Sequence, residues 1–357
     1  MEEKNELRIV EKSNKKHKNK KIWKLLIVIL VISILIISGV IITIYIYTDR
    51  KIEKTQQIYI PKEKLGITKE IEENLEEYTN IAIFGIDSSD LEYSTGYRSD
   101  CIIIASINNK TKEIKLVSIY RDTYVNIDGY GLDKITHAYS YGGPQLAINT
   151  INTNFDLNIS EFITVNFDSV SDVIDQLGGI DIEIQEDELQ YINGYIGATA
   201  NSVGKKSTFV TQAGMQTLDG IQSVAYSRIR YTEGGDYKRT ERMRNVIIAI
   251  IEKAKTKKIS ELNNIVDNLL PKVATNITLD FIIKMIPRGF NYSVIDSVGW
   301  PYETRGITLN LWYGVPVTLE SNVVRLHKEI FNEPNYIVSD TVKDISDRII
   351  RKTGYKY

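Results

Sequence analysis

The sequence predicts an α/β fold, in which a layered mixed β-sheet is flanked by helices and preceded by one N-terminal transmembrane helix. Three observations lead to this prediction. Residues 25–48 form an uncharged run rich in Ile, Leu and Val. From residue 80 onwards, short apolar segments bounded by Gly, Asn and Asp recur, as buried strands do. Helical segments lie between them, and such interleaving is typical of layered α/β domains.

The apolar run is long enough to cross a membrane. As a helix, residues 25–48 would measure about 36 Å at roughly 1.5 Å per residue, against about 30 Å for a bilayer core. The run is too long for a cleaved signal peptide, and no small-residue cleavage site follows it. Residues 1–24 carry nine Lys or Arg and four Glu, so the N-terminus is expected in the cytoplasm. We therefore expect a single-pass protein of the cell membrane with a large extracellular part.

Three further regions are expected after the anchor. Residues 49–79 are polar and charged, and they are expected to form an extracellular stalk with one short helix near 69–78. The globular domain is expected over residues 80–335. The polar residues 336–357 are expected to form a loosely ordered tail.

Apolar runs and local start and stop signals predict the elements of the domain. Pro144 suits a first helical turn, Asp168 or Ser169 suits a helix N-cap, and Gly178-Gly179 suits a helix end. Strands are expected at residues 81–86, 101–107, 113–119, 162–166, 180–184, 291–300 and 307–312. Helices are expected at residues 142–155, 168–177, 218–227, 237–258, from 260, 278–287 and 318–331, and residues 187–214 are expected to be irregular.

Charge and cysteine content exclude several classes of protein. The formal net charge is −2, and because residues 1–24 contribute +5, the remainder carries −7. An acidic domain argues against nucleic-acid binding. Cys101 is the only cysteine, and we interpret it as a small buried apolar residue. The three histidines lack zinc-ligand spacing, so a metal is expected to be bound by oxygen.

The segment 226–244 gathers arginines around one Gly-Gly-Asp turn. Arg228 and Arg230 alternate, as on an extended chain, and Arg239 and Arg242 are three residues apart, on one helix face. Guanidinium groups are planar and permanently charged, so several at one point suit a phosphate-rich anion. A solvated charged helix is the alternative. The arginines are Arg228, Arg230, Arg239, Arg242 and Arg244.

Charged residues also lie where the first three predicted strands begin or end. Asp87 follows the first strand and Asp100 precedes the second. Two such carboxylates either hold a hard cation such as Mg²⁺ or cap turns. Arg121-Asp122 ends the third strand, where such a pair is often only a surface ion pair. Lys134, farther on, is either a functional cation or a solvated loop lysine.

These motifs, in this order, resemble those of the LytR-CpsA-Psr proteins over about residues 78–335. The matching motifs are Asp87, Arg98-Ser-Asp100, Tyr120-Arg-Asp122-Thr-Tyr-Val, Lys134-Ile-Thr, Tyr141-Gly-Gly, Leu177-Gly-Gly-Ile-Asp181, Leu218-Asp-Gly220, Ala225-Tyr-Ser-Arg-Ile-Arg230 and Asp236-x-x-Arg239-x-x-Arg242. Cys101, Thr136-His137 and Met243-Arg244 depart from common family residues, and none of them removes a charged group from the expected site.

The resemblance implies a membrane-anchored phosphotransferase of a Gram-positive-type envelope. Such enzymes move a secondary glycopolymer, such as teichoic acid or capsule, from a polyprenyl-pyrophosphate carrier to peptidoglycan. It implies Asp87 and Asp100 as Mg²⁺ ligands and Asp236 as an acid at the metal or reaction centre, where it could take the acceptor's proton. It implies Arg98 and Arg121 as catalytic residues. The implied pyrophosphate contacts are Arg98, Arg121, Lys134, Arg228, Arg230 and Arg239.

The isoprenoid chain of such a carrier needs an apolar site. For one set of residues, a tunnel between sheet and helices and an ordinary core are both open interpretations. These residues are Ile148, Ile151, Phe155, Phe162, Val165, Phe167, Ile174 and Leu177. Sugar specificity is expected to lie in loops such as 187–214.

Two other functions are compatible with the same residues. The arginines could clamp a polyprenyl pyrophosphate without catalysis, in a lipid-binding envelope protein. A transcriptional attenuator would instead need its large domain in the cytoplasm.

Protease added to intact cells is expected to degrade residues 80–357, because the positive-inside pattern places them outside. A cytoplasmic marker protein should stay intact in the same sample. Degradation of the domain only after lysis would contradict this topology.

Overall fold

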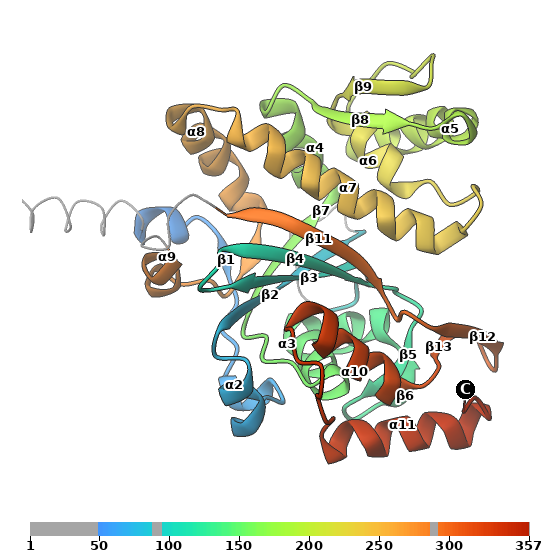
Figure 1. Cartoon of the computed structure of the whole chain (residues 1–357). Helices are drawn as coiled ribbons and strands as arrows, with labels where there is room; N and C mark the ends of the chain where they lie inside the picture. Colours follow the sequence, from blue (N-terminus) through green and yellow to red (C-terminus); the bar gives the residue numbers. More distant parts are fainter. Residues whose placement is uncertain (1–48, 88–94, 286–291, 357) are drawn as a thin grey trace, which may run out of the picture. The chain divides into compact units, whose positions relative to one another are not determined.

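The computed structural model describes residues 49–87, 95–285 and 292–356 (Figure 1). The expected transmembrane helix at residues 25–48 lies outside these ranges. Among the described residues, no helix is long and apolar enough to cross a bilayer. Residues Ile52–Tyr357 form one unit, which is built on a central sheet.

The central sheet has seven strands and is mixed, as the predicted fold class requires. Strands β2, β3 and β4 are antiparallel neighbours, whereas β2 pairs with β7 and β4 pairs with β11 in parallel. The prediction of an α/β fold with a mixed sheet is therefore confirmed. Across the sheet the strands are β1 (Gln56–Gln57), β10 (Ala274–Thr275), β7 (Glu161–Asn166), β2 (Tyr78–Ile86), β3 (Ser99–Asn108), β4 (Glu113–Ile119) and β11 (Ser293–Trp300).

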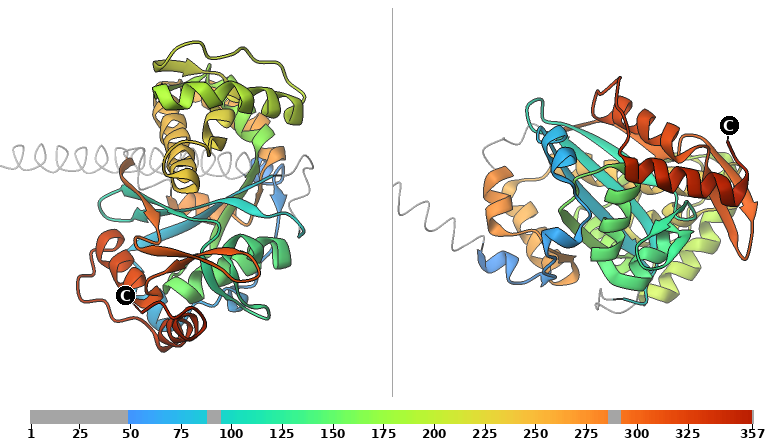
Figure 2. Two further views of the ribbon diagram at one scale, coloured as in Figure 1. Left: turned by 90° about the vertical axis from the view of Figure 1, so that its right-hand side faces the viewer. Right: turned by 90° about the horizontal axis from the view of Figure 1, so that it is seen from below.

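Helices cover both faces of this sheet (Figures 1 and 2). One face is covered by α2 (Lys69–Asn74), α3 (Ile135–Phe155), α10 (Leu319–Ile330) and α11 (Asp340–Thr353). Toward the other lie α4 (Phe167–Gln176), α5 (Glu186–Val203), α6 (Gly220–Arg228), α7 (Gly235–Lys255) and α8 (Ile259–Leu269). Helix α9 (Leu279–Met285) lies beside the β1 edge of the sheet (Figure 1). The remaining elements are the hairpins β5 (Tyr124–Ile127)–β6 (Gly131–Lys134), β8 (Ile180–Ile184)–β9 (Gly214–Leu218) and β12 (Thr304–Thr308)–β13 (Trp312–Pro316), and the short helices η1 (Lys62–Lys64) and η2 (Leu270–Lys272).

The alternation of side chains along β3 divides the apolar core between the two faces. Ile102 and Ile104 belong to the main cluster, which includes α3, α10 and α11. Ile103 belongs to a small cluster on the other face, against which Ile247 of α7 packs. Successive strand residues point to opposite faces, so one continuous apolar run serves both.

The segment predicted to be a stalk is part of the domain. Strand β1 pairs with β10, and Leu65 and Leu75 are 1% and 0% exposed in the main cluster. The short helix expected near residues 69–78 is present as α2, with Thr68 as its N-cap. Most residues of the segment are polar, which predicted a stalk, but a few widely spaced apolar residues pack into the main core.

The residues predicted to be a loose tail form helix α11. Val342, Ile345 and Ile349 lie on one face of this helix and are buried in the main cluster. Their spacing of three and four residues is that of an amphipathic helix, and the many charged residues between them belong to its exposed face.

Residues 187–214, predicted to be irregular, are largely helical. Helix α5 buries Ile192 and Ile196, and a capping box of Gln185 and Glu188 starts it. Its glycines Gly194 and Gly197 do not interrupt it. Each glycine costs a helix only about 1 kcal/mol relative to alanine, which the buried face offsets.

Two helix starts also differ from the predictions. Helix α3 begins at Ile135, and its expected start at Gly142 is a kink at which Gly143 has a φ of +62°. Helix α4 is capped by Asn166, whose side chain accepts from Ser169 N, rather than by Asp168 or Ser169. The glycine pair that was expected to end α4 does so.

Replacing Ile345 by Ala is expected to lower the free energy of unfolding by about 2–5 kcal/mol, because it opens a cavity in the main core. Ile345 is 2% exposed, whereas Ile337 just before the helix is 80% exposed. The control Ile337→Ala should change stability by less than about 0.5 kcal/mol. Urea denaturation measures both, and equal losses would contradict the packing of α11.

Candidate functional site

A cavity of about 390 Å³ lies where strands β2, β3 and β4 meet the helices above the sheet. Antiparallel pairing places Gly85 of β2 opposite Cys101 of β3, so Asp87 and Asp100 emerge at the same edge. Arg121 follows the end of β4. The cavity is lined by most of the predicted site residues, namely Asp87, Arg98, Asp100, Arg121, Arg228, Arg230 and Arg239.

The carboxylate of Asp100 holds three guanidinium groups together. Its Oδ2 lies 2.7 Å from Arg121 Nη1, 3.8 Å from Arg230 Nη2 and 4.0 Å from Arg239 Nη1. Arg239 Nη2 also donates to the main-chain oxygen of Asp100 at 3.3 Å. The other carboxylate oxygen, Oδ1, is buried and has no hydrogen-bond partner among the described residues. It is thus available to a ligand of the cavity.

The arginines of the cavity outnumber its acids. Among the residues that the structure describes, five arginines and two aspartates line it, and together these leave a surplus of three positive charges. Burial works to lower the pKa of Arg121, but the neighbouring Asp100 and Asp122 raise it overall. Arg228 is held differently, since its Nη1 donates to Thr199 Oγ1 at 2.9 Å and its guanidinium lies 4.9 Å from the Phe167 ring centroid. A surplus of fixed guanidinium groups suits a multiply charged anion.

Asp236 lies in the first turn of α7, beside the cavity. Its Oδ1 is 3.3 Å from Arg239 Nη2 and 3.6 Å from Arg230 Nε. Burial raises the pKa of Asp236, although Arg121 and Arg230 oppose the shift. The preceding glycines Gly234 and Gly235 have φ of +87° and +51°. This left-handed turn, which favours glycine, starts α7 at the point that brings Arg239 to the cavity.

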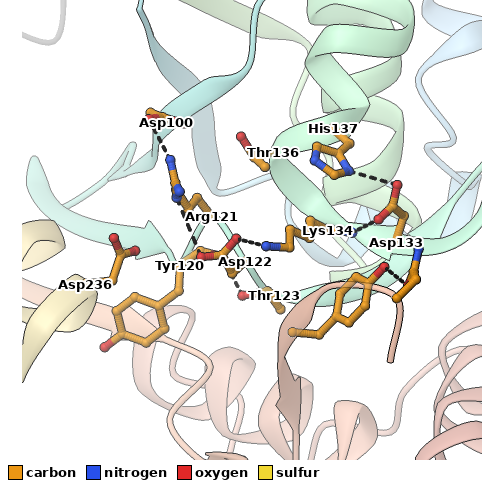
Figure 3. Close-up of polar contacts among 12 residues, drawn as sticks. Asp100, Tyr120, Arg121, Asp122, Thr123, Asp133, Lys134, Thr136, His137 and Asp236 are labelled. Atoms are coloured by element: carbon orange, nitrogen blue, oxygen red, sulfur yellow. Dashed lines mark hydrogen bonds and ion pairs between the residues drawn. The ribbon is translucent and has the colours of Figure 1, made fainter. Parts of the chain in front are cut away.

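Lys134 does not line the cavity. Its Nζ lies 2.6 Å from Asp122 Oδ1, and Asp122 Oδ2 lies 3.6 Å from Arg121 Nε (Figure 3). The structure therefore places Lys134 at the end of a chain of ion pairs that leads to Arg121. Such a residue positions the arginine instead of meeting the anion directly.

The two remaining arginines of the segment 226–244, Arg242 and Arg244, are buried but do not line the cavity. Arg242 is buried and donates to Glu188 Oε1 at 2.6 Å, to Ile229 O at 3.0 Å and to Thr232 Oγ1 at 2.6 Å. It therefore ties α5 and the loop after α6 to α7. Arg244 is also buried, and burial lowers its pKa.

Cys101 lies beside the cavity, opposite Gly85 of β2. Burial raises the pKa of its thiol to about 12, so the thiolate is scarce at neutral pH. This agrees with its interpretation as a small apolar residue.

Sequence reasoning missed three aromatic or sulfur-containing side chains of the cavity wall. Tyr195, Tyr231 and Met243 line it together with Phe167. Met243 is four residues before Ile247, so both lie on the sheet-facing side of α7. Tyr195 was not expected at the site because its segment was predicted to be irregular. Tyr231 belongs to the arginine-rich segment 226–244, but no role in the site was assigned to it.

The predicted tunnel residues do not share one location. Ile148, Ile151, Phe155 and Phe162 are fully buried in the main core, on the face of the sheet away from α7. Ile174 belongs to the cluster formed with β8, β9, α5 and α6. For these residues the ordinary-core interpretation is confirmed, and of the whole set only Phe167 lines the cavity.

An apolar stripe runs along the other face of the sheet toward the cavity. Gly85 of β2 pairs with Val165 of β7 on one side and with Cys101 of β3 on the other. Two residues farther from the cavity along β2, Ile83 pairs with Ile163 of β7. All are only half-buried, whereas the alternate residues Phe84 and Phe162 are fully buried. The apolar surface that remains accessible is therefore on the face toward α7.

The sequence profile of the LytR_cpsA_psr family matches residues 42–322. The chain belongs to this family. The match includes every residue that lines the cavity of about 390 Å³, which we call the arginine cavity. It also includes Lys134 and Asp236.

Relatives within the family are named for one activity. TagT of Bacillus subtilis, a polyisoprenyl-teichoic acid–peptidoglycan teichoic acid transferase, is 32% identical over 235 residues, or 64% of this chain and 70% of TagT. TagU of Oceanobacillus iheyensis, which bears the same activity name, is 33% identical over 262 residues, or 70% of this chain and 74% of TagU. A solved structure of TagT with bound octaprenyl pyrophosphate lipid superposes with a TM-score of 0.53 and 26% identity, over 72% of this chain and 92% of that one.

Proposed function

We propose that this protein transfers a phosphate-linked cell-wall glycopolymer from a polyprenyl-pyrophosphate carrier to peptidoglycan. The observation that carries the proposal is the cavity in which Asp100 gathers three arginines beside Asp236. A pyrophosphate between lipid and sugar is the multiply charged anion that such a cavity suits. The family membership and the activity named for TagT and TagU support the same reaction.

The apolar stripe beside the cavity offers a place for the isoprenoid chain. Half-buried Ile83, Ile163 and Val165 lead away from Asp87 on the sheet face toward α7. A lipid that covered them would remove apolar surface from water, worth about 25 cal/mol per Å². The proposed anchor at residues 25–48 would keep the domain beside the membrane that holds this lipid.

We also propose that Asp87 and Asp100 hold a Mg²⁺ ion. Asp100 Oδ1 is buried and free of hydrogen bonds within the described part of the chain, and Asp87 faces the same cavity. Mg²⁺ is commonly held by one or two carboxylates together with substrate phosphates, so the donor set fits. When bound, the ion would neutralise charge on the pyrophosphate.

The residues of the chain account for the remaining chemistry. The guanidinium groups of Arg121, Arg230 and Arg239 would spread the negative charge of the two phosphates and stabilise the leaving lipid phosphate. An acceptor hydroxyl oxygen would then bond to the sugar-proximal phosphorus as the bond to the bridging oxygen breaks. The products are a phosphodiester and a lipid monophosphate. Asp236, whose pKa is raised by burial, would take the hydroxyl proton.

Arg230→Ala and Arg228→Ala are each expected to reduce transfer by about 100-fold or more, the scale of losing one preorganised charge contact to a reacting group. Arg230 is partly exposed and Arg228 ends its helix, so the fold should survive. Transfer is measured with lipid-linked polymer, Mg²⁺ and peptidoglycan, and the control is Arg325→Ala, which removes a surface ion pair with Glu329. Wild-type rates in both cavity variants would refute the site. Binding of the lipid-linked polymer without transfer would instead indicate a non-catalytic carrier-binding protein.

The rate of transfer is expected to fall at acidic pH as Asp236 becomes protonated, which gives the acid limb of the pH profile. A base must be deprotonated to act, and because burial raises the pKa of Asp236, the fall should begin at a higher pH than for an ordinary aspartate. Asp236→Asn should remove the limb and reduce kcat by about 10²–10⁴-fold. Profiles of kcat against pH test this for both proteins. An unchanged acid limb in the Asn variant would assign the titration to another group.

A further inference from the structure

A second cavity, of about 560 Å³, lies among the hairpin β5–β6, the start of α3 and the loop that joins β12 to β13. It is lined mainly by aromatic and aliphatic side chains. Four tyrosines, Tyr124, Tyr130, Tyr141 and Tyr313, take part. We refer to it as the tyrosine cavity. The mechanism above uses none of its residues.

Two of these tyrosines form a solvent-facing platform. The rings of Tyr130 and Tyr141 stack with centroids 4.3 Å apart and planes 13° apart. Tyr130 is 56% exposed and Tyr141 is 38% exposed. Leu309 and Leu311, from the β12–β13 loop, are also exposed at the cavity. Aromatic surface held rigid and exposed in a hollow is typical of a ligand site.

Polar groups of the tyrosine cavity are fixed in orientation. Asp133 Oδ2 accepts from Tyr141 Oη at 2.8 Å and lies 2.9 Å from His137 Nδ1. When Nδ1 donates to Asp133, the neutral imidazole presents Nε2 as an acceptor. Tyr313 Oη donates to Asn310 Oδ1 at 2.7 Å. The cavity thus combines flat apolar surface with directed hydrogen-bonding groups.

The tyrosine cavity is connected to the arginine cavity by the chain of ion pairs described above. Lys134, which pairs with Asp122 and through it with Arg121, follows Asp133 in sequence, and Lys134 N donates to Asp133 Oδ1 at 2.7 Å (Figure 3). Lys134 Nζ also lies 5.8 Å from the Tyr313 ring centroid. A single run of residues, 121–133, therefore contributes side chains to both cavities.

We propose that the tyrosine cavity binds a sugar ring of the acceptor glycan strand. A sugar ring has apolar C–H faces, which pack on aromatic rings, and hydroxyl groups around its edge, which suit groups such as Asp133, His137 and Asn310. Among the described residues that line the cavity, the charged side chains Asp133 and Lys352 balance, and no arginine is present. The cavity thus lacks the surplus of positive charge that suits the phosphate-rich donor to the arginine cavity, whereas an acceptor glycan has sugar rings without phosphate. The assignment rests on the proposed function.

The test uses the full-length protein with peptide-free glycan strands from peptidoglycan. Tyr130→Ala and Tyr141→Ala are each expected to weaken glycan binding by about tenfold, the scale of a lost apolar contact in a pocket. Tyr130→Phe keeps the ring and should bind like the wild type. Tyr59→Ala removes a tyrosine that is 88% exposed and outside the cavity, and it serves as the matched control. In transfer assays, Tyr130→Ala should raise the acceptor KM and leave the donor KM and kcat unchanged.

The outcomes separate this proposal from the proposed function. Unchanged glycan binding in both alanine variants would overturn the sugar site, and so would a raised donor KM with an unchanged acceptor KM. If the wild type bound glycan through Tyr130 but transferred no polymer, the sugar site would stand and the proposed transferase function would fail.

Discussion

The arginine cavity depends on the carboxylate of Asp100. Three guanidinium groups, from the end of β4, the loop after α6 and helix α7, lie within 4.0 Å of one oxygen of this residue. Like charges about 4 Å apart repel by about 4 kcal/mol at an effective dielectric constant of about 20. Asp100 offsets this repulsion before any ligand arrives, and it joins the sheet to the helical layer above it. Its unpaired Oδ1 leaves part of the same carboxylate for the ligand.

Site residues could be predicted to lie together only where few residues separate them or where regular strand pairing relates them. Asp87 and Asp100 could be placed together because antiparallel neighbours bring the end of one strand to the start of the next. Arg228, Arg230 and Arg239 could be placed around a turn because two glycines there permit left-handed backbone. Lys134 could not be placed, because its partner Asp122 is brought to it by the β5–β6 hairpin. The tyrosine cavity could not be foreseen, because it combines residues 124–141 with residues 309–313.

The elements of the fold that could be predicted are those with many apolar residues. The central strands β2, β3 and β4 carry apolar residues on both faces, and sequence patterns detect such apolar runs well. Helices α5 and α11 and the segment before β2 bury only a few apolar side chains each. Their charged and polar residues dominate the composition, so they resembled loops and tails. Composition indicates how much of an element is exposed, whereas only the spacing of its apolar residues indicates whether it packs.

Segments far apart in the sequence complete both the central sheet and the main core. Strand β1 pairs with β10, and the main core is completed by Val342, Ile345 and Ile349 of α11. These contacts have a high sequence separation, so a growing chain cannot bury the core until α11 has left the ribosome. Until then the central strands expose apolar surface and unpaired edges. The main core is therefore fully covered only when nearly the whole chain has been synthesised.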